Sequence, residues 1–336
     1  MKNLLFLFLI IVIVAAGYFV YLQKNGWDYR NLLPGNNKPV EINEKKDNVS
    51  LIFVGDIMLS RDVQDKMVKE NNWSWPFLKI GKWLSDADLT FGNLEGPISD
   101  QGTNVGSIYS FRADPRVIEG LKYAGFDVFS VANNHMGDWA SPAFEDTLNR
   151  LAKAGIDYVG GGFNQQEAYS PLKKIIKNTT FCFFAYTDLG PRSFEASGDK
   201  SGMAFLDIES AQEDLEKNRP NCNLIIVSLH FGDEYKEKAN SRQKTIAKAL
   251  ADSGADLIIG HHSHVIGEIE TLPNKTQPEK NTYVYYSLGN FLFDQLFSEK
   301  TRQGIALVVE IKDKKITDIL PRATYISNDL ETTLIE

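Results

Sequence analysis

The chain has 336 residues, of which 43% are hydrophobic and 24% charged, and its formal net charge is −8 at pH 7. This composition is that of a globular protein, and it excludes a disordered, a collagen-like or a disulfide-framework chain. The acidic balance argues against nucleic acid as a partner, because phosphate groups are bound through Lys and Arg. It permits a metal site that is rich in carboxylates.

The first predicted element is an apolar N-terminal segment. Residues Leu4 to Leu22 carry no charge, and a helix needs about 20 such residues to cross the hydrocarbon core of a membrane. Lys2 precedes this run, which favours a cytoplasmic N-terminus and an exported remainder. We therefore expect residues 1–24 to be an uncleaved membrane anchor, with a cleaved signal peptide as the alternative.

A polar linker and one folded domain are predicted to follow. Residues 25–48 are rich in Pro, Gly and Asn and are expected to be flexible. In residues 49–336, short apolar runs alternate with amphipathic stretches, which is typical of an α/β domain with helices outside the sheet. Hairpin patterns at residues 173–186 and after Gly304 predict a mixed sheet or two packed sheets. The expected strands are 51–54, 89–91, 128–131, 158–159, 181–186, 224–229, 257–259, 283–287 and 305–311, and the expected helices are 114–124, 142–154 and 241–253.

The two cysteines, Cys182 and Cys222, lie in or just before apolar strand-like runs. Two thiols cannot build a disulfide framework, and small buried thiols are common in protein cores. We expect two buried free thiols here, with a single disulfide as the alternative.

The histidines are the most informative polar residues of the chain. They fall in three short segments, and each segment follows directly on an apolar run. Ligands bind at the carboxyl ends of strands in crossover folds, and imidazole, carboxylate and amide groups suit Zn, Mn or Fe. The sequence therefore predicts a metal site at one edge of the sheet, large enough for two ions. Its candidate residues are His135, His230, His261, His262 and His264, joined by Asp56, Asn93 and Glu95 from two further strand ends.

Six segments together resemble the CapA family of capsule and poly-γ-glutamate synthesis proteins, which is part of the calcineurin-like metallophosphatase superfamily. They follow in order from about residue 50 to about residue 310. The segments are VGDIMLSRDV (54–63), FGNLEGPIS (91–99), FRADPRVIEGLKYAGFDVFSVANNH (111–135), HFGDEY (230–235), ADSGADLIIGHHSHVIGEIE (251–270) and YSLGNFLFDQ (286–295).

The resemblance implies a four-layer α/β/β/α sandwich of two mixed sheets, with a site for two divalent metal ions (Mn, Zn or Fe) at the sheet edge. One departure from the superfamily pattern concerns Met58, which stands where a ligand histidine is usual. A thioether is a poor ligand for these metals, so the first metal site is expected to be weak. The metal ligands that the resemblance implies are Asp56, Glu95, Asn134, His230, His262 and His264.

The resemblance also implies roles outside the ligand set. His135 resembles the histidine that protonates the leaving oxygen. Arg61, Asn93 and Asn290 are expected to contact substrate. The alternative for Arg61 is a salt bridge. Asn93 could instead occupy the position of the ligand that bridges the two metals. Asn290 could instead form a turn or orient a ligand histidine. His261 is expected to lie behind the ligands or in solvent.

The expected function is that of a membrane-anchored, extracytoplasmic, metal-dependent hydrolase of the phosphoesterase type in a capsule or poly-γ-glutamate pathway. Its expected partners are the membrane and an anionic envelope polymer or a phosphoester substrate. The alternative is a non-catalytic anchored subunit that works with membrane synthase or export proteins.

Overall fold

The computed structural model describes residues 48–335. The expected anchor (1–24) and all but the last residue of the expected linker (25–48) lie outside the described residues. Among the helices of residues 48–335, none is long and apolar enough to cross a membrane.

The described region alternates strands and helices along most of its length. Its strands are β1 (Val49–Ile57), β2 (Leu89–Leu94), β3 (Val128–Ser130), β4 (Asp157–Val159), β5 (Gly161–Gly162), β6 (Leu172–Ile176), β7 (Thr179–Thr187), β8 (Gly202–Met203), β9 (Leu224–His230), β10 (Leu257–His261), β11 (Ile269–Pro273), β12 (Asn281–Tyr285), β13 (Asn290–Leu292), β14 (Gln303–Lys312), β15 (Lys315–Ile326) and β16 (Thr332–Leu334). Its α-helices are α2 (Arg61–Lys69), α3 (Gly81–Ser85), α4 (Ile118–Tyr123), α5 (Ala140–Ala154), α6 (Gln165–Tyr169), α7 (Ile208–Asn218), α8 (Ser241–Asp252) and α9 (Glu299–Arg302).

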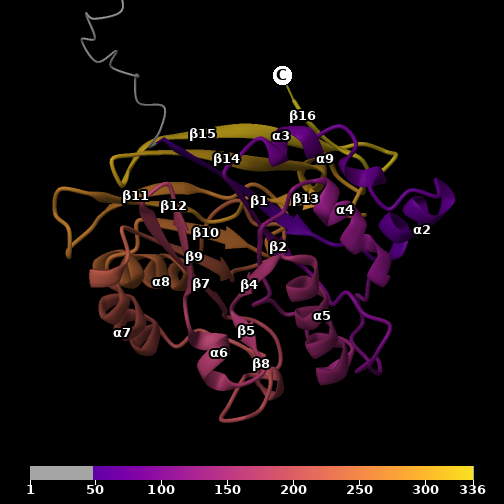
Figure 1. Ribbon diagram of the computed structural model, residues 1–336, viewed down its shortest axis with the longest axis horizontal. Helices are drawn as coiled ribbons and strands as arrows, with labels where there is room; N and C mark the ends of the chain where they lie inside the picture. Colours follow the sequence, from indigo (N-terminus) through magenta and orange to yellow (C-terminus); the bar gives the residue numbers. More distant parts are fainter. Residues whose placement is uncertain (1–47, 336) are drawn as a thin grey trace, which may run out of the picture. The chain divides into compact units, whose positions relative to one another are not determined.

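The strands form two large mixed sheets and one small one (Figure 1). The eight-stranded sheet has the order β16-β15-β14-β1-β2-β3-β4, and β13 also pairs with β1. The six-stranded sheet has the order β11-β12-β10-β9-β7-β6. Strands β1 to β4 run parallel, whereas β14, β15 and β16 pair in antiparallel fashion. The expectation of two mixed sheets is confirmed.

Three apolar cores hold the layers together. Between the two sheets lie Phe53, Phe91 and Phe183, and the rings of the last two stack with centroids 5.8 Å apart. Helices α4 and α5 bury their apolar faces against the larger sheet, and α7 and α8 against the smaller one (Figure 1). Each fully buried Phe contributes about 1.5–3 kcal/mol. The order of layers is helix, sheet, sheet, helix, as expected.

Local signals fix several element ends. Gly155 follows α5 in the left-handed conformation, at φ 77°, where a residue without a Cβ atom is favoured. Asn240 caps α8 by accepting a hydrogen bond from the backbone N–H of Gln243 at 2.9 Å. The predicted hairpin at residues 173–186 is present as β6 and β7, and its turn residues Lys177 and Asn178 both have positive φ.

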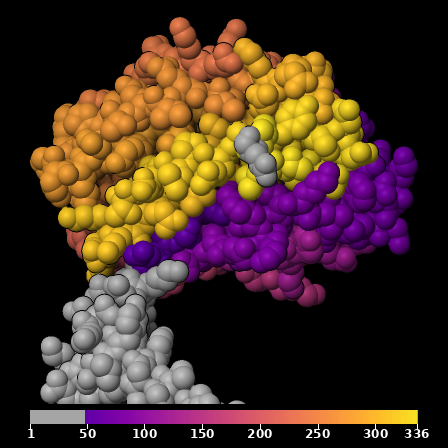
Figure 2. All heavy atoms as spheres, turned by 90° about the horizontal axis from the view of Figure 1, so that it is seen from above, coloured from indigo at the N-terminus to yellow at the C-terminus, as the bar shows by residue number. Residues whose placement is uncertain are grey.

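The C-terminal strands form an outer edge of the larger sheet. The long hairpin of β14 and β15 attaches to β1 through five register pairs that begin with Val49 and Ile311. In the space-filling view these strands form a yellow band beside the indigo N-terminal part of the described chain (Figure 2). The first and the last strand of the described region, β1 and β16, therefore belong to the same sheet.

The cysteines form a disulfide, so the expectation of two free thiols is wrong. Cys182 lies in β7, and Cys222 lies two residues before β9. The two strands pair in parallel with Cys182 opposite Ile225, and this register brings the Cα atoms of Cys182 and Cys222 to 5.8 Å, a usual distance for a disulfide. Both cysteines are buried in the core beneath α7 and α8.

The disulfide should contribute to stability, because it joins residues 40 positions apart in the sequence. A chain with Cys182→Ala and Cys222→Ala should unfold with a free energy about 2–4 kcal/mol lower than that of the parent. Urea unfolding of both chains measures this difference. Reductant should destabilise the parent and leave the double variant unchanged. Two free thiols in the denatured, unreduced parent would contradict the prediction.

Candidate metal centre

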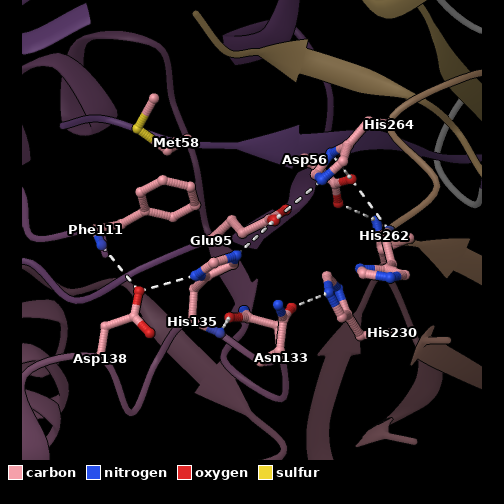
Figure 3. Close-up of polar contacts among 12 residues, drawn as sticks. Asp56, Met58, Glu95, Phe111, Asn133, His135, Asp138, His230, His262 and His264 are labelled. Atoms are coloured by element: carbon pink, nitrogen blue, oxygen red, sulfur yellow. Dashed lines mark hydrogen bonds and ion pairs between the residues drawn. The ribbon is translucent and has the colours of Figure 1, made fainter. Parts of the chain in front are cut away.

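The predicted site residues converge at the carboxyl ends of strands from both sheets. Asp56 near the end of β1 pairs in register with Asn93 of β2. In the other sheet, His230 at the end of β9 pairs with His261 at the end of β10. Figure 3 shows Asp56, Glu95, His230, His262 and His264 grouped around one space. Parallel pairing therefore places these residues at one edge, as the sequence predicted.

Asp56 depends on the glycine that precedes it. A Cβ atom on Gly55 would lie 1.9 Å from the carbonyl oxygen of Gly289, so no other residue fits there without a shift of the backbone. The close approach lets the backbone N–H of Asp56 donate a hydrogen bond to that oxygen at 3.0 Å. It also allows β13 to pair beside Asp56.

Two carboxylates are buried side by side in the centre. Asp56 is 0% exposed and Glu95 is 1% exposed. The amide Nδ2 of Asn93 donates a hydrogen bond to Asp56 Oδ1 at 2.8 Å and to Glu95 Oε2 at 3.4 Å. Asn93 Oδ1 in turn accepts a hydrogen bond from Asn133 Nδ2 at 3.1 Å. Asn93 is thus fully buried between the two carboxylates. It does not line the pocket that opens beside His135.

His264 is oriented by the amide of Asn290. Its Nδ1–H donates a hydrogen bond to Asn290 Oδ1 at 3.0 Å, while its Nε2 lies 3.7 Å from Glu95 Oε1. Asn290 is itself held by Thr301, whose carbonyl accepts a hydrogen bond from Nδ2 at 2.9 Å. This is the arrangement by which a neighbour fixes the tautomer and direction of a metal-binding imidazole. It places Asn290 behind a histidine and away from the pocket wall.

The other histidines lie around the same space. His230 Nε2 and Asn134 Oδ1 are 2.7 Å apart, and the rings of His230 and His262 lie 4.9 Å apart. His261 is fully buried, and its Nδ1 lies 3.3 Å from Asp56 Oδ1. His262 and His264 have φ values of 92° and 57°, a strained conformation that persists at sites where the surroundings enforce it.

The donor set fits divalent cations. Ligand atoms of Asp56, Glu95 and His230 lie within 4.8 Å of one another, and those of Glu234, His262 and His264 do so as well. Within residues 48–335, several buried polar atoms of this centre have no hydrogen-bond partner, namely Glu95 Oε1, both ring nitrogens of His261 and Nδ1 of His262. Unpaired buried polar atoms are rare because they cost about 1–3 kcal/mol each. Mixed carboxylate and imidazole ligands suit Zn, Mn or Fe.

The two carboxylates of the centre share one protonated imidazole. Burial would lower the pKa of His264, but the charges of Glu95 and Asp56 raise it to about 9. Burial and the charge of Asp56 raise the pKa of Glu95 well above its usual value. Burial would also raise the pKa of Asp56, but the imidazoles of His261 and His264 hold it well below its usual value. Burial and the neighbouring His264 lower the pKa of His262 to about 4, so that this ring is neutral and free to bind a metal.

His135 stands at the entrance of the centre with a carboxylate behind it. Its Nδ1–H donates a hydrogen bond to Asp138 Oδ2 at 2.8 Å, and the same oxygen accepts the backbone N–H of Phe111 at 2.9 Å. The other ring nitrogen, Nε2, lies 3.9 Å from Glu95 Oε1 (Figure 3). A histidine held in this way can deliver a proton from Nε2 to a group bound beside Glu95.

A pocket of about 240 Å³ leads to this histidine. Its wall includes His135, His264 and Glu234, with Arg61 and Asp294 at one side. Arg61 forms a two-pronged ion pair with Asp294, and its guanidinium lies 4.9 Å from the ring centre of Phe111. Arg61 therefore lines the pocket, and it makes the salt bridge that was the alternative to substrate contact.

Met58 takes no part in the centre. Its side chain is fully buried, and its sulfur accepts hydrogen bonds from the backbone N–H and hydroxyl of Ser60 at 3.1 and 3.0 Å. Figure 3 shows the side chain above the ring of Phe111 and well to the left of Asp56. Met58 thus offers no ligand atom to the residues of the centre.

Two residues of the site, Asp138 and Glu234, were not assigned from the sequence. Asp138 lies three residues after His135, and this spacing could have drawn attention to it. Glu234 lies within the segment HFGDEY, but nothing in its pattern separates it from the neighbouring acids. Of the two positions expected for His261, behind the ligands or in solvent, the structure has the first, because it buries this residue against Asp56.

Comparisons with known proteins agree with the geometry. The family model described as "Bacterial capsule synthesis protein PGA_cap" matches residues 50–295. "Capsule biosynthesis protein CapA" of Bacillus anthracis is 28% identical over 84% of this chain and 69% of its own length. "PGA biosynthesis protein CapA" of Bacillus subtilis is 30% identical over 79% of this chain and 68% of its own.

Among solved structures, a 5'-nucleotidase precursor from Thermus thermophilus covers 86% of this chain and 54% of its own length, at 13% identity and a TM-score of 0.48. This chain therefore spans about half the length of that protein. The family assignment rests on the match over residues 50–295 and on the two curated relatives. It confirms the resemblance that the sequence motifs indicated. The chain belongs to the PGA_cap family of bacterial capsule synthesis proteins.

Proposed function

We propose that the chain is a metal-dependent hydrolase of phosphoesters that acts in the synthesis of a capsule or of poly-γ-glutamate. The observation that carries this proposal is the His135–Asp138 pair, which faces the buried carboxylate of Glu95 from the pocket side. A centre that only stabilised the fold would need no histidine held at its entrance. Phosphomonoesters or phosphodiesters of the cell envelope are the proposed substrates.

In the proposed mechanism, one set of site residues holds cations and a second set moves a proton. Asp56, Glu95, Asn134, His230, His262 and His264 would hold two divalent ions. When bound, such ions lower the pKa of a water molecule and neutralise charge on the phosphoryl oxygens. His135 gives a proton from Nε2 to the leaving oxygen, and Asp138 keeps Nδ1 protonated and the ring in place.

The proposed location is the outer side of the cytoplasmic membrane. The uncharged segment from Leu4 to Leu22 has the length of a membrane anchor. The disulfide of Cys182 and Cys222 supports this location independently, because disulfides persist in oxidising compartments and are rare in the cytosol.

A second candidate function is favoured by Met58. Met58 stands where a ligand histidine is usual, and without that histidine the centre could be unable to turn over a substrate. The chain would then be a non-catalytic, anchored subunit that binds an anionic polymer and membrane synthase or export proteins. In this case Asp56 and His262 would be needed for structure or binding only, and variants at His135 would leave capsule synthesis unchanged.

Metal content is the first test. The full chain, purified without chelator, should hold about two Zn, Mn or Fe ions, and His262→Ala should hold fewer. Removal of metal with a chelator should abolish phosphoester hydrolysis, and added Mn²⁺ should restore it. Elemental analysis together with a circular dichroism spectrum measures both metal and fold. A folded parent chain without metal would rule out the hydrolase.

The role of His135 can be separated from a structural role by the choice of ester. His135→Ala should lower kcat by about 10²–10⁴-fold on an alkyl phosphate, whose leaving oxygen needs a proton. The loss should be much smaller on a nitrophenyl phosphate, whose leaving oxygen is already acidic. Steady-state rates on both esters measure the difference.

Asp138→Asn is the matched variant, because it keeps the shape of the side chain at position 138 and weakens the hydrogen bond from His135 Nδ1. It should show the same dependence on the leaving group with a smaller loss. Metal content should be unchanged in both variants. Equal losses on the two esters, or full activity of His135→Ala on the alkyl ester, would refute the general-acid role.

A further inference from the structure

Glu234 is an acid that the proposed mechanism does not use, although it faces the metal centre. It lies in the loop between β9 and α8 and is exposed. One of its carboxylate oxygens lies within 4.8 Å of ring nitrogens of both His262 and His264. It also lines the pocket that leads to His135. The carboxylate of Glu234 is therefore the exposed acid beside the two histidines, whereas Asp56 and Glu95 are buried.

The position of Glu234 is fixed by the backbone on either side of the site. The N–H of Tyr235 donates a hydrogen bond to the carbonyl of Ser263 at 2.7 Å, and Ser263 is the residue between His262 and His264. The hydroxyl of Tyr235 accepts a hydrogen bond from Gln295 at 3.3 Å. The residue after Glu234 is thus tied to the turn that carries both histidines.

This placement carries a conformational cost. Tyr235, His262 and His264 all have positive φ, at 61°, 92° and 57°. Each non-glycine residue in this region costs about 1–3 kcal/mol and persists only where the surroundings enforce it. The strain lies in the loop and in the turn that face each other, so the two backbones are held in the geometry that brings Glu234 to the histidines.

Among the described residues, one ring nitrogen of His262 lacks a hydrogen-bond partner, and the carboxylate of Glu234 lacks a cationic one. His262 is 8% exposed, and its Nδ1 has no hydrogen-bond partner within residues 48–335. Lys300 pairs with Glu237 further along the loop at 2.9 Å, whereas no Lys or Arg of the described residues pairs with Glu234. The carboxylate of Glu234, the imidazole of His262 and the imidazole of His264, which Asn290 orients, form a ligand set for a divalent cation.

We propose that Glu234 is a direct ligand of a divalent metal ion, together with His262 and His264. The proposal rests on the metal centre of the proposed function and extends it on the solvent side. Glu234 supplies an oxygen ligand where Met58 supplies none, and it makes the centre more favourable for Mn²⁺ or Zn²⁺ than the buried residues alone. Since the loop carries the ligand, this part of the centre is also the part from which an ion exchanges with solvent.

The test compares Mn²⁺ binding by the full chain and by Glu234→Gln, after the metal has been stripped with a chelator. Glu234→Gln should weaken the binding of one ion by about 10-fold or more, since even residues behind a ligand change affinity by 10–100-fold. Asp233→Asn removes a charge one residue away and should bind Mn²⁺ like the parent. Glu234→His, which restores a ligand, should recover most of the affinity. Calorimetric titration and thermal melts measure affinity and fold.

The outcomes separate this inference from the proposed function. Two Mn²⁺ ions bound equally by the parent and by Glu234→Gln would overturn the role of Glu234 and leave the hydrolase proposal standing. An equal loss in Asp233→Asn would show an effect of local charge and would also overturn it. A parent chain that binds no Mn²⁺ would overturn both proposals.

Discussion

Two carboxylates that are buried side by side determine which positively charged groups the centre needs. Asp56 and Glu95 share hydrogen bonds from one amide, that of Asn93, and neither reaches solvent. Burying one unpaired carboxylate costs several kcal/mol, and a second of like charge beside it costs more. No Lys or Arg of the described chain pairs with either of them. Within residues 48–335, one positive charge faces both carboxylates, that of His264, whose Nδ1 lies 3.4 Å from Asp56 and whose Nε2 lies 3.7 Å from Glu95. A divalent cation would balance the pair more fully, and the surrounding histidines are ligands that can hold it.

The fold meets this constraint through backbone pairing rather than through side-chain contacts. The register of β1 with β2 and of β9 with β10 delivers polar residues from two sheets to one edge. The close approach of Gly55 to Gly289 and the positive φ of His262 and His264 then set the course of the backbone at the strand ends. The apolar core between the sheets supplies the stability that offsets this local strain.

The parts of this structure that could be predicted from sequence are those with a local signal. Strands such as Leu224–His230 are continuous apolar runs, and each histidine segment follows one directly. The strand Lys315–Ile326 is largely exposed and contains Pro321, so no periodicity marks it. The disulfide depended on the parallel register of β7 and β9, which a separation of 40 residues does not reveal. Glu234 was missed for a similar reason, because one backbone hydrogen bond, from Tyr235 to Ser263, brings its loop to the histidines.

The pairing of Arg61 bears on both candidate functions. An anionic substrate or polymer that enters the pocket meets Arg61 already bound to Asp294, and it meets the carboxylate of Glu234 as well. The pocket thus offers an anion no free positive charge among these residues, and the chain as a whole is acidic. Strong attraction of an anion to this site would come from bound cations. Catalysis and polymer binding at this pocket therefore depend on the same ions, whereas only catalysis requires the proton on His135. The two functions differ in the use of one imidazole, and the contact of that imidazole with Asp138 favours catalysis.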